Sequence, residues 1–107
     1  MEVREQMMGG RGSVQIRHIL NSGEAGHSCR LFARVVLEPG GSIGFHEHHK
    51  ETEVYYVLRG TGTADHNGEA QRLEPGTVMA IGDGMSHSIC NDGDDQLEFL
   101  AVIIMDG

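Results

Sequence analysis

Basic residues are scarce in this chain of 107 residues, with eight Lys and Arg against sixteen Asp and Glu and a net charge of −8. So little positive charge argues against a surface that binds nucleic acid or an anionic membrane. A metal ion is a more suitable partner than either of these for a chain with this excess of acidic residues. An anionic small molecule would need local positive charge, which a bound metal could supply.

Cysteine is also scarce, and Cys29 and Cys90 are too far apart in the sequence for a CxxC pair. One disulfide is possible, but two buried free thiols fit a cytoplasmic chain better. Met1–Gly10 carries charges and no apolar centre, so we expect neither a signal peptide nor a transit peptide. The longest apolar run, Phe99–Met105, is too short to cross a bilayer. These features predict a soluble, cytoplasmic protein.

The length allows one domain, taken as residues 1–107, and sixteen glycines suggest short strands joined by tight turns. No stretch has a convincing helical period. Apolar and β-branched runs between Gly, Pro, Asn and Asp predict strands at Leu31–Leu37, Ser42–His48, Glu53–Leu58, Thr61–Asp65, Gln71–Leu73, Thr77–Ile81, Ser86–Cys90 and Gln96–Met105. Many short strands at this spacing predict an all-β sandwich or barrel.

Several details follow from local patterns. Asn67-Gly68 predicts a type I′ hairpin turn. The apolar end of Gln96–Met105 predicts a strand buried on both faces. The first thirty residues are less regular: Val14–Leu20 suggests a strand, whereas Met7–Gly12 and Asn21–Gly26 resemble loops.

Four residues stand out as metal ligands: His46, His48, Glu53 and His87. In a strand, residues two apart project to the same face, so strict alternation in Ser42–His48 places His46 and His48 together and Ile43 opposite them. Glu53 opens the next strand, and His87 comes from a distant one. Three imidazoles and a carboxylate suit Mn, Fe, Ni, Cu, Co or Zn better than Ca or Mg.

Glycines at fixed distances from these residues make the pattern more specific. With them, the chain resembles the cupin superfamily. The first cupin motif has Gly, five residues, His-x-His, three or four residues, Glu, six residues and Gly. It is matched over residues 40–60 by Gly40, His46, His48, Glu53 and Gly60.

The second motif has Gly, five residues, Pro-x-Gly, two residues, His, three residues and Asn. It is matched over residues 76–91 by Gly76, Gly84, His87 and Asn91, with Gly82 where the family has Pro.

This resemblance covers most of the chain after Leu31, leaving residues 1–30 as a strand and loop extension. It implies a double-stranded β-helix, or jelly-roll barrel, with one divalent metal held inside by His46, His48, Glu53 and His87. Small bacterial members are often manganese-binding and often pair, so we expect Mn, with Fe, Ni or Zn as alternatives, and a homodimer. A cupin that has lost its metal is the simpler alternative, but all four ligands are retained here.

Other residues are weaker candidates for substrate binding: Tyr55, Arg34, Met79, Met85 and Phe99. Tyr55 is as easily a core tyrosine, and Phe99 and the two methionines as easily core filler. The sequence leaves open whether the Arg34 side chain points into the barrel or away from it. Glu51 competes with Glu53 as the carboxylate ligand, but the family spacing favours Glu53 and makes Glu51 a solvated loop residue.

The residues favour a metal-dependent protein that binds a small oxygen-rich anion, such as a dicarboxylate, keto acid or sugar acid. An oxidoreductase or decarboxylase, a sugar isomerase or lyase, and a binding module without turnover all remain open, because the cupin fold hosts many reactions. The pattern therefore assigns no catalytic residue.

Overall fold

The computed structural model describes residues 2–20 and 28–105, apart from the side chains of Phe45 and His46. Strands dominate this part of the chain. They are β1 (Glu2–Glu5), β2 (Ser13–His18), β3 (Cys29–Leu37), β4 (Ser42–Glu47), β5 (Glu51–Arg59), β6 (Gly62–His66), β7 (Glu69–Leu73), β8 (Val78–Ile81), β9 (Ser86–Cys90) and β10 (Leu97–Met105), with a short 3-10 helix, η1 (Met7–Gly9).

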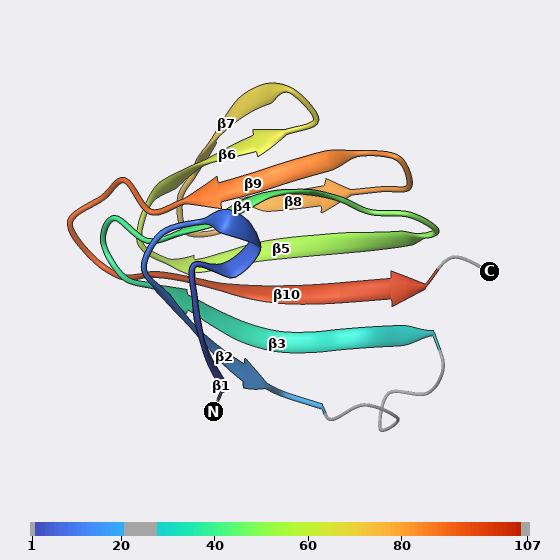
Figure 1. The fold of residues 1–107 in the computed structure, drawn as a ribbon, viewed down its shortest axis with the longest axis horizontal. Coiled ribbons are helices and arrows are strands. Elements are labelled where there is room, and N and C mark those ends of the chain that lie inside the picture. Colours follow the sequence, from blue (N-terminus) through green and yellow to red (C-terminus); the bar gives the residue numbers. More distant parts are fainter. Residues whose placement is uncertain (1, 21–27, 106–107) are drawn as a thin grey trace.

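The strands form two antiparallel sheets. One has the order β1-β2-β3-β10-β5-β8 and the other β4-β9-β6-β7. Figure 1 shows β3, β10 and β5 running side by side across the molecule, with the β6–β7 hairpin at the far edge. This arrangement is the double-stranded β-helix, so the predicted all-β jelly roll is confirmed.

Apolar residues at alternate positions of the strands fill the space between the sheets, as expected for strands with one inward face. The larger sheet contributes Val14, Ile16, Val35, Leu37, Tyr55, Val57, Phe99 and Ala101, and the smaller one Ile43, Ala64, Leu73 and Ile89. One continuous core therefore supports both sequence motifs, which lie on β4–β5 and β8–β9.

The β6–β7 turn has the predicted geometry. Asn67 and Gly68 have φ angles of 52° and 92°, and positive φ at both central residues defines a type I′ turn. The register pairs His66 with Glu69 directly across the hairpin.

Strand β4 does not alternate as its sequence suggests. Ser42 and Ile43 pair with Cys90 and Ile89, but the register shifts before His46 pairs with His87, so β4 carries one extra residue. Such a bulge reverses the faces that follow it. Ile43 and His48 are therefore both buried, and their predicted placement on opposite faces is wrong.

The N-terminal part contains more structure than the sequence suggests. Strand β1, which was not predicted, pairs with β2, and the expected strand ends at His18 rather than at Leu20. The predicted loop at Met7–Gly12 includes η1, whereas the predicted loop at Asn21–Gly26 lies outside the described residues.

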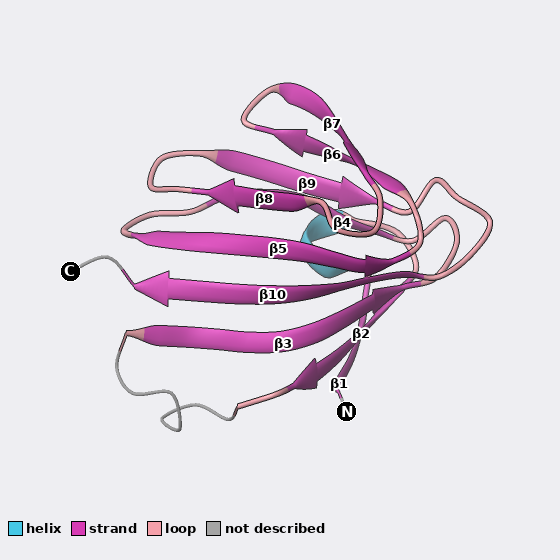
Figure 2. Ribbon diagram, turned by 180° about the vertical axis from the view of Figure 1, so that it is seen from behind, coloured by secondary structure: helices cyan, strands magenta, loops and turns pink. Residues whose placement is uncertain are grey.

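Helix η1 lies tightly against β4. A Cβ on Gly44 would lie 1.8 Å from the Met8 carbonyl oxygen, and one on Gly10 would lie 2.1 Å from that of Ser42. Figure 2 shows the helix beyond β5, next to β4. Glycine at these two positions allows the backbones to touch, and this contact places η1 beside the interior of the barrel.

Strand β10 is not buried on both faces as predicted. Phe99, Ala101 and Ile103 are buried, but Leu100 is half-buried and Ile104 is 44% exposed. The outward face of the strand therefore carries exposed apolar surface. Among the described residues, no helix is long and apolar enough to cross a membrane.

Candidate metal centre

Three predicted ligands meet inside the barrel. His48 Nε2 lies 2.9 Å from His87 Nε2 and 2.9 Å from Glu53 Oε1, and His87 Nε2 lies 3.2 Å from the same oxygen. The two imidazole rings are stacked, with centroids 4.9 Å apart. All three side chains are buried, with exposed fractions of 4% for His48, 6% for Glu53 and 0% for His87. Residues from three separate segments therefore present donor atoms to one point.

The spacing of these atoms fits one metal ion. Bonds of about 2.1 Å at right angles separate neighbouring donor atoms by about 3 Å, close to the three separations observed. Neutral imidazole and carboxylate together suit a divalent transition metal. The cluster of His48, Glu53 and His87 could therefore hold such an ion.

The fourth predicted ligand, His46, lies outside the part of the structure whose side chains are described. Its backbone is described and pairs with His87 in the β4–β9 ladder. The assignment of His46 as a ligand therefore remains a prediction.

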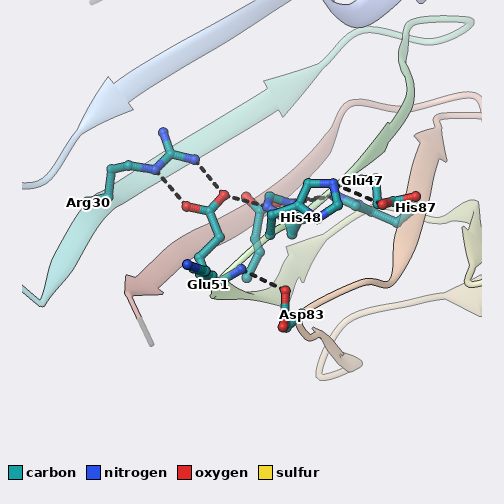
Figure 3. Close-up of polar contacts among 9 residues, drawn as sticks. Arg30, Glu47, His48, Glu51, Asp83 and His87 are labelled. Atoms are coloured by element: carbon teal, nitrogen blue, oxygen red, sulfur yellow. Dashed lines mark hydrogen bonds and ion pairs between the residues drawn. The ribbon is translucent and has the colours of Figure 1, made fainter. Parts of the chain in front are cut away.

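The turn that carries His48 is anchored to the loop between β8 and β9. The His48 amide donates to the Met85 carbonyl at 3.1 Å, and the Gly84 amide donates to the His48 carbonyl at 2.8 Å. The Lys50 amide donates to Asp83 Oδ1 at 2.7 Å (Figure 3). These bonds hold the first motif against the second.

Glu51 is not a solvated loop residue, contrary to the prediction. It begins β5, and its side chain is only 12% exposed. Arg30 donates to both of its oxygens, and His48 Nδ1 lies 2.7 Å from Glu51 Oε1 (Figure 3). The hydrogen bonds from Arg30 and then His48 lower the pKa of Glu51 to about 2, although partial burial opposes them.

No short sequence pattern identifies this role for Glu51, because Arg30 reaches it through a second bulge. In the β3–β10 ladder, Ile103 pairs with Leu31 and Ile104 pairs with Cys29, so Arg30 is the extra residue. A bulge re-aims the side chain it carries, and Arg30 lines the cavity described below.

Tyr55 lies directly beside the cluster. Its ring is tilted against His87 at 5.4 Å and against Phe99 at 4.8 Å. Burial raises the pKa of Tyr55 well above its usual value, and the charge of Glu53 and a hydrogen bond to it act in the same direction. Tyr55 is therefore a neutral phenol that donates to Glu53 and fixes that carboxylate.

A cavity of about 300 Å³ opens from the cluster. His48, Glu53 and Tyr55 line one part of it, and the apolar walls come from both sheets and from η1. Those wall residues are Met7, Met8, Ile16, Leu31, Val35, Ile43, Phe99, Ala101 and Ile103. Charged and polar residues complete the lining: Glu2, Arg4, His18 and Arg30. The space is large enough for a small organic anion beside a metal.

The remaining substrate candidates are distributed over different places. Phe99 and Tyr55 line the cavity. Arg34 lies on the outside of the larger sheet, where it pairs with Glu98, in a depression shared with Arg17. Met79 is buried in the core, and Met85 packs against it from the β8–β9 loop. Arg34 and the two methionines are thus not among the described residues that line the cavity.

Comparison with known proteins places the chain among related sequences. A model of the cupin domain matches residues 33–103. An oxalate-binding protein of Thermotoga maritima is 46% identical over 99 residues, which cover 92% of this chain and 82% of the relative. A glucose-6-phosphate isomerase of Thermococcus onnurineus is 32% identical over 66% of this chain, but the match spans only 44% of that relative.

Among solved structures, a predicted oxalate decarboxylase of Thermotoga maritima superposes with a TM-score of 0.95 at 44% identity, covering 97% of this chain and 90% of that one. The domain match, this near-complete similarity and the observed topology lead to one conclusion. The chain belongs to the cupin family.

Proposed function

We propose that this cupin binds a divalent transition metal through His46, His48, Glu53 and His87, and uses it to hold a small oxygen-rich anion, with oxalate as the first candidate. The observation that carries the proposal is the convergence of His48, Glu53 and His87 at donor separations of 2.9–3.2 Å beside a cavity. Of the possible metals we propose Mn first, with Fe, Ni or Zn as alternatives.

The charges around the cavity leave a bound metal as the source of positive charge for an anionic ligand. Arg4 pairs with Glu2 and Arg30 with Glu51, so each lining arginine already has a carboxylate partner. A bound divalent ion would supply the positive charge that an anionic ligand needs, and would act as a Lewis acid on its oxygens. The similarity to an oxalate-binding protein supports a short dicarboxylate.

The chain's own residues have distinct tasks in this proposal. Imidazoles and a carboxylate hold the ion, and Tyr55 orients Glu53 through its hydroxyl. The apolar walls exclude water from the ligand and limit its size. The described residues that line the cavity include no serine, threonine or cysteine nucleophile, so the proposal is oriented binding of the anion, with no reaction assigned to it.

Thermal melts of chelator-treated protein test the proposal. We expect oxalate to raise the melting temperature after Mn²⁺ is added and to have little effect before. Ligand at about 100 times its Kd stabilises the folded state by about 2.7 kcal/mol. A metal-independent shift with oxalate would contradict the mechanism.

Two variants separate the site from its surroundings. His48→Ala should abolish both the Mn²⁺-dependent shift and the oxalate shift. His49→Ala is the matched control, because its side chain is 72% exposed and pairs with Glu47 on the surface. Equal behaviour of the two variants would show that the metal binds elsewhere.

Isomerisation of a phosphorylated sugar is the second candidate, and the similarity to a glucose-6-phosphate isomerase favours it. It needs the same ion but a larger ligand. Melts with glucose 6-phosphate, fructose 6-phosphate and oxalate in parallel distinguish the two: the ligand that stabilises only the metal-loaded protein identifies the class.

We also propose that the protein is a cytoplasmic homodimer. Its two cysteines are free thiols, which is usual in a reducing compartment. The outward face of the larger sheet carries exposed Tyr56, Leu58, Val78 and Ile104, an apolar surface that a second copy could cover. Cell fractionation tests the location.

A further inference from the structure

Glu51 is not one of the predicted metal ligands, but it contacts the His48 ring at Nδ1, the nitrogen that points away from the cluster. His48 Nδ1 lies 2.7 Å from Glu51 Oε1, while Nε2 of the same ring faces Glu53 and His87. Arg30 Nη2 donates to the same Glu51 oxygen at 2.9 Å, and Arg30 Nε donates to the other at 3.0 Å. The three residues form a chain from the cavity lining to the cluster (Figure 3).

This chain determines where His48 carries its proton. A carboxylate held by a two-pronged arginine is ionised and can only accept hydrogen bonds. Nδ1 of His48 therefore carries a proton that it donates to Glu51. In the metal-free protein Glu53 competes for a proton at Nε2, 2.9 Å away, whereas a metal ion at the cluster would take the Nε2 lone pair and leave the proton on Nδ1.

The fold builds the arrangement from two local features. Glu51 and Glu53 are two apart on β5 and so share a face, which places one carboxylate at each nitrogen of the His48 ring. The bulge in β3 turns Arg30 toward the same region across β10, which separates β3 from β5. The contact thus links strands that are not neighbours in the sheet.

We propose that Glu51, held by Arg30, is a positioning residue that fixes the tautomer and ring orientation of His48 so that Nε2 is presented to the metal. The inference rests on the proposed metal site. Carboxylates in this outer position typically change metal affinity by about 10- to 100-fold.

The first test uses the metal-free protein and needs no activity. Nitrogen-15 NMR of the histidine rings should show His48 protonated at Nδ1 in the wild type. Glu51→Ala should shift the proton toward Nε2, where Glu53 can accept a hydrogen bond, and Glu51→Gln, whose amide oxygen can still accept a hydrogen bond from Nδ1–H, should largely restore the wild-type form. An unchanged tautomer in Glu51→Ala overturns the inference.

The second test is calorimetric titration with Mn²⁺ and Zn²⁺. We expect the Kd to rise by about 10- to 100-fold in Glu51→Ala, and by less in Glu51→Gln and Arg30→Ala. Glu47→Ala is the matched control, because Glu47 pairs with exposed His49. Wild-type affinity in Glu51→Ala would contradict the proposal.

The two tests separate two kinds of failure. If the wild type binds no metal, the proposed function is wrong, while the tautomer measurement still decides the role of Glu51. Circular dichroism of each variant shows whether it is folded. A folded Glu51→Ala protein with unaltered His48 rules out positioning by this carboxylate.

Discussion

At the scale of single residues, Asn91 shows how the second motif supports the barrel. Its side chain is fully buried; Nδ2 donates to the carbonyls of Leu37 and Asp95 at 2.9 and 2.8 Å, and Oδ1 accepts from the Gly93 amide at 3.0 Å. The motif position is therefore structural: it ties the loop after β9 to the end of β3.

Replacing Asn91 by Ala should be strongly destabilising, since it leaves buried backbone groups without partners. We expect a loss on the order of 3 kcal/mol in the free energy of unfolding, measured by urea denaturation. Asp95→Ala is the control, because its side chain is 80% exposed and its carbonyl is retained. If the free energy of unfolding fell equally in the two variants, the hydrogen bonds of the Asn91 side chain would not have this structural role.

The sequence could predict that His48, Glu53 and His87 come together, because donor types at a fixed spacing within glycine-rich motifs are visible in the chain itself. That these residues and His46 bind a metal stays a prediction. The sequence could not predict Glu51, whose burial depends on an arginine from another strand and on the bulge that turns that arginine inward. A bulge shifts by one residue the alternation of inward and outward side chains along a strand. Nothing in the sequences of β3 and β4 indicates where their bulges occur.

At the scale of elements, the close approach of η1 to β4 yields a prediction. Gly44→Ala would place a methyl group against the Met8 carbonyl and push the N-terminal segment away from the cavity. We expect a loss of about 1–3 kcal/mol, measured by thermal or urea unfolding. Gly82→Ala is the control, since its new methyl would meet only Met85 at 3.7 Å. A neutral Gly44→Ala would show that η1 is not tightly seated.

Turns and strands with a strong local sequence signal were predicted correctly. The strands that were missed or misjudged depend on pairing between residues distant in sequence. Asn67-Gly68 specifies its turn by backbone preference alone. Strand β1, with the sequence EVRE, has little apolar alternation and exists because β2 offers an edge to pair with. The apolar sequence of β10 does not reveal that no second layer of the described residues covers the outward face of this strand.

At the scale of the whole molecule, that outward face predicts self-association. Val78 pairs with Tyr56, and Tyr56 with Leu100, so an apolar row crosses three strands. Light scattering should give twice the chain mass of 11.6 kDa for the wild type and the single mass for Val78→Glu. Val3→Glu, at an exposed apolar site on β1, should stay dimeric. A monomeric wild type would refute the dimer.

The position of β10 has a consequence for how the protein is made. This strand is synthesised after every other described strand, yet it lies in the middle of the larger sheet, between β3 and β5. During synthesis, β3 and β5 stay unpaired along the edges that they later share with β10 until β10 has left the exit tunnel of the ribosome. Folding is therefore completed late, through contacts distant in sequence, which slows it and leaves nascent chains dependent on protection from aggregation.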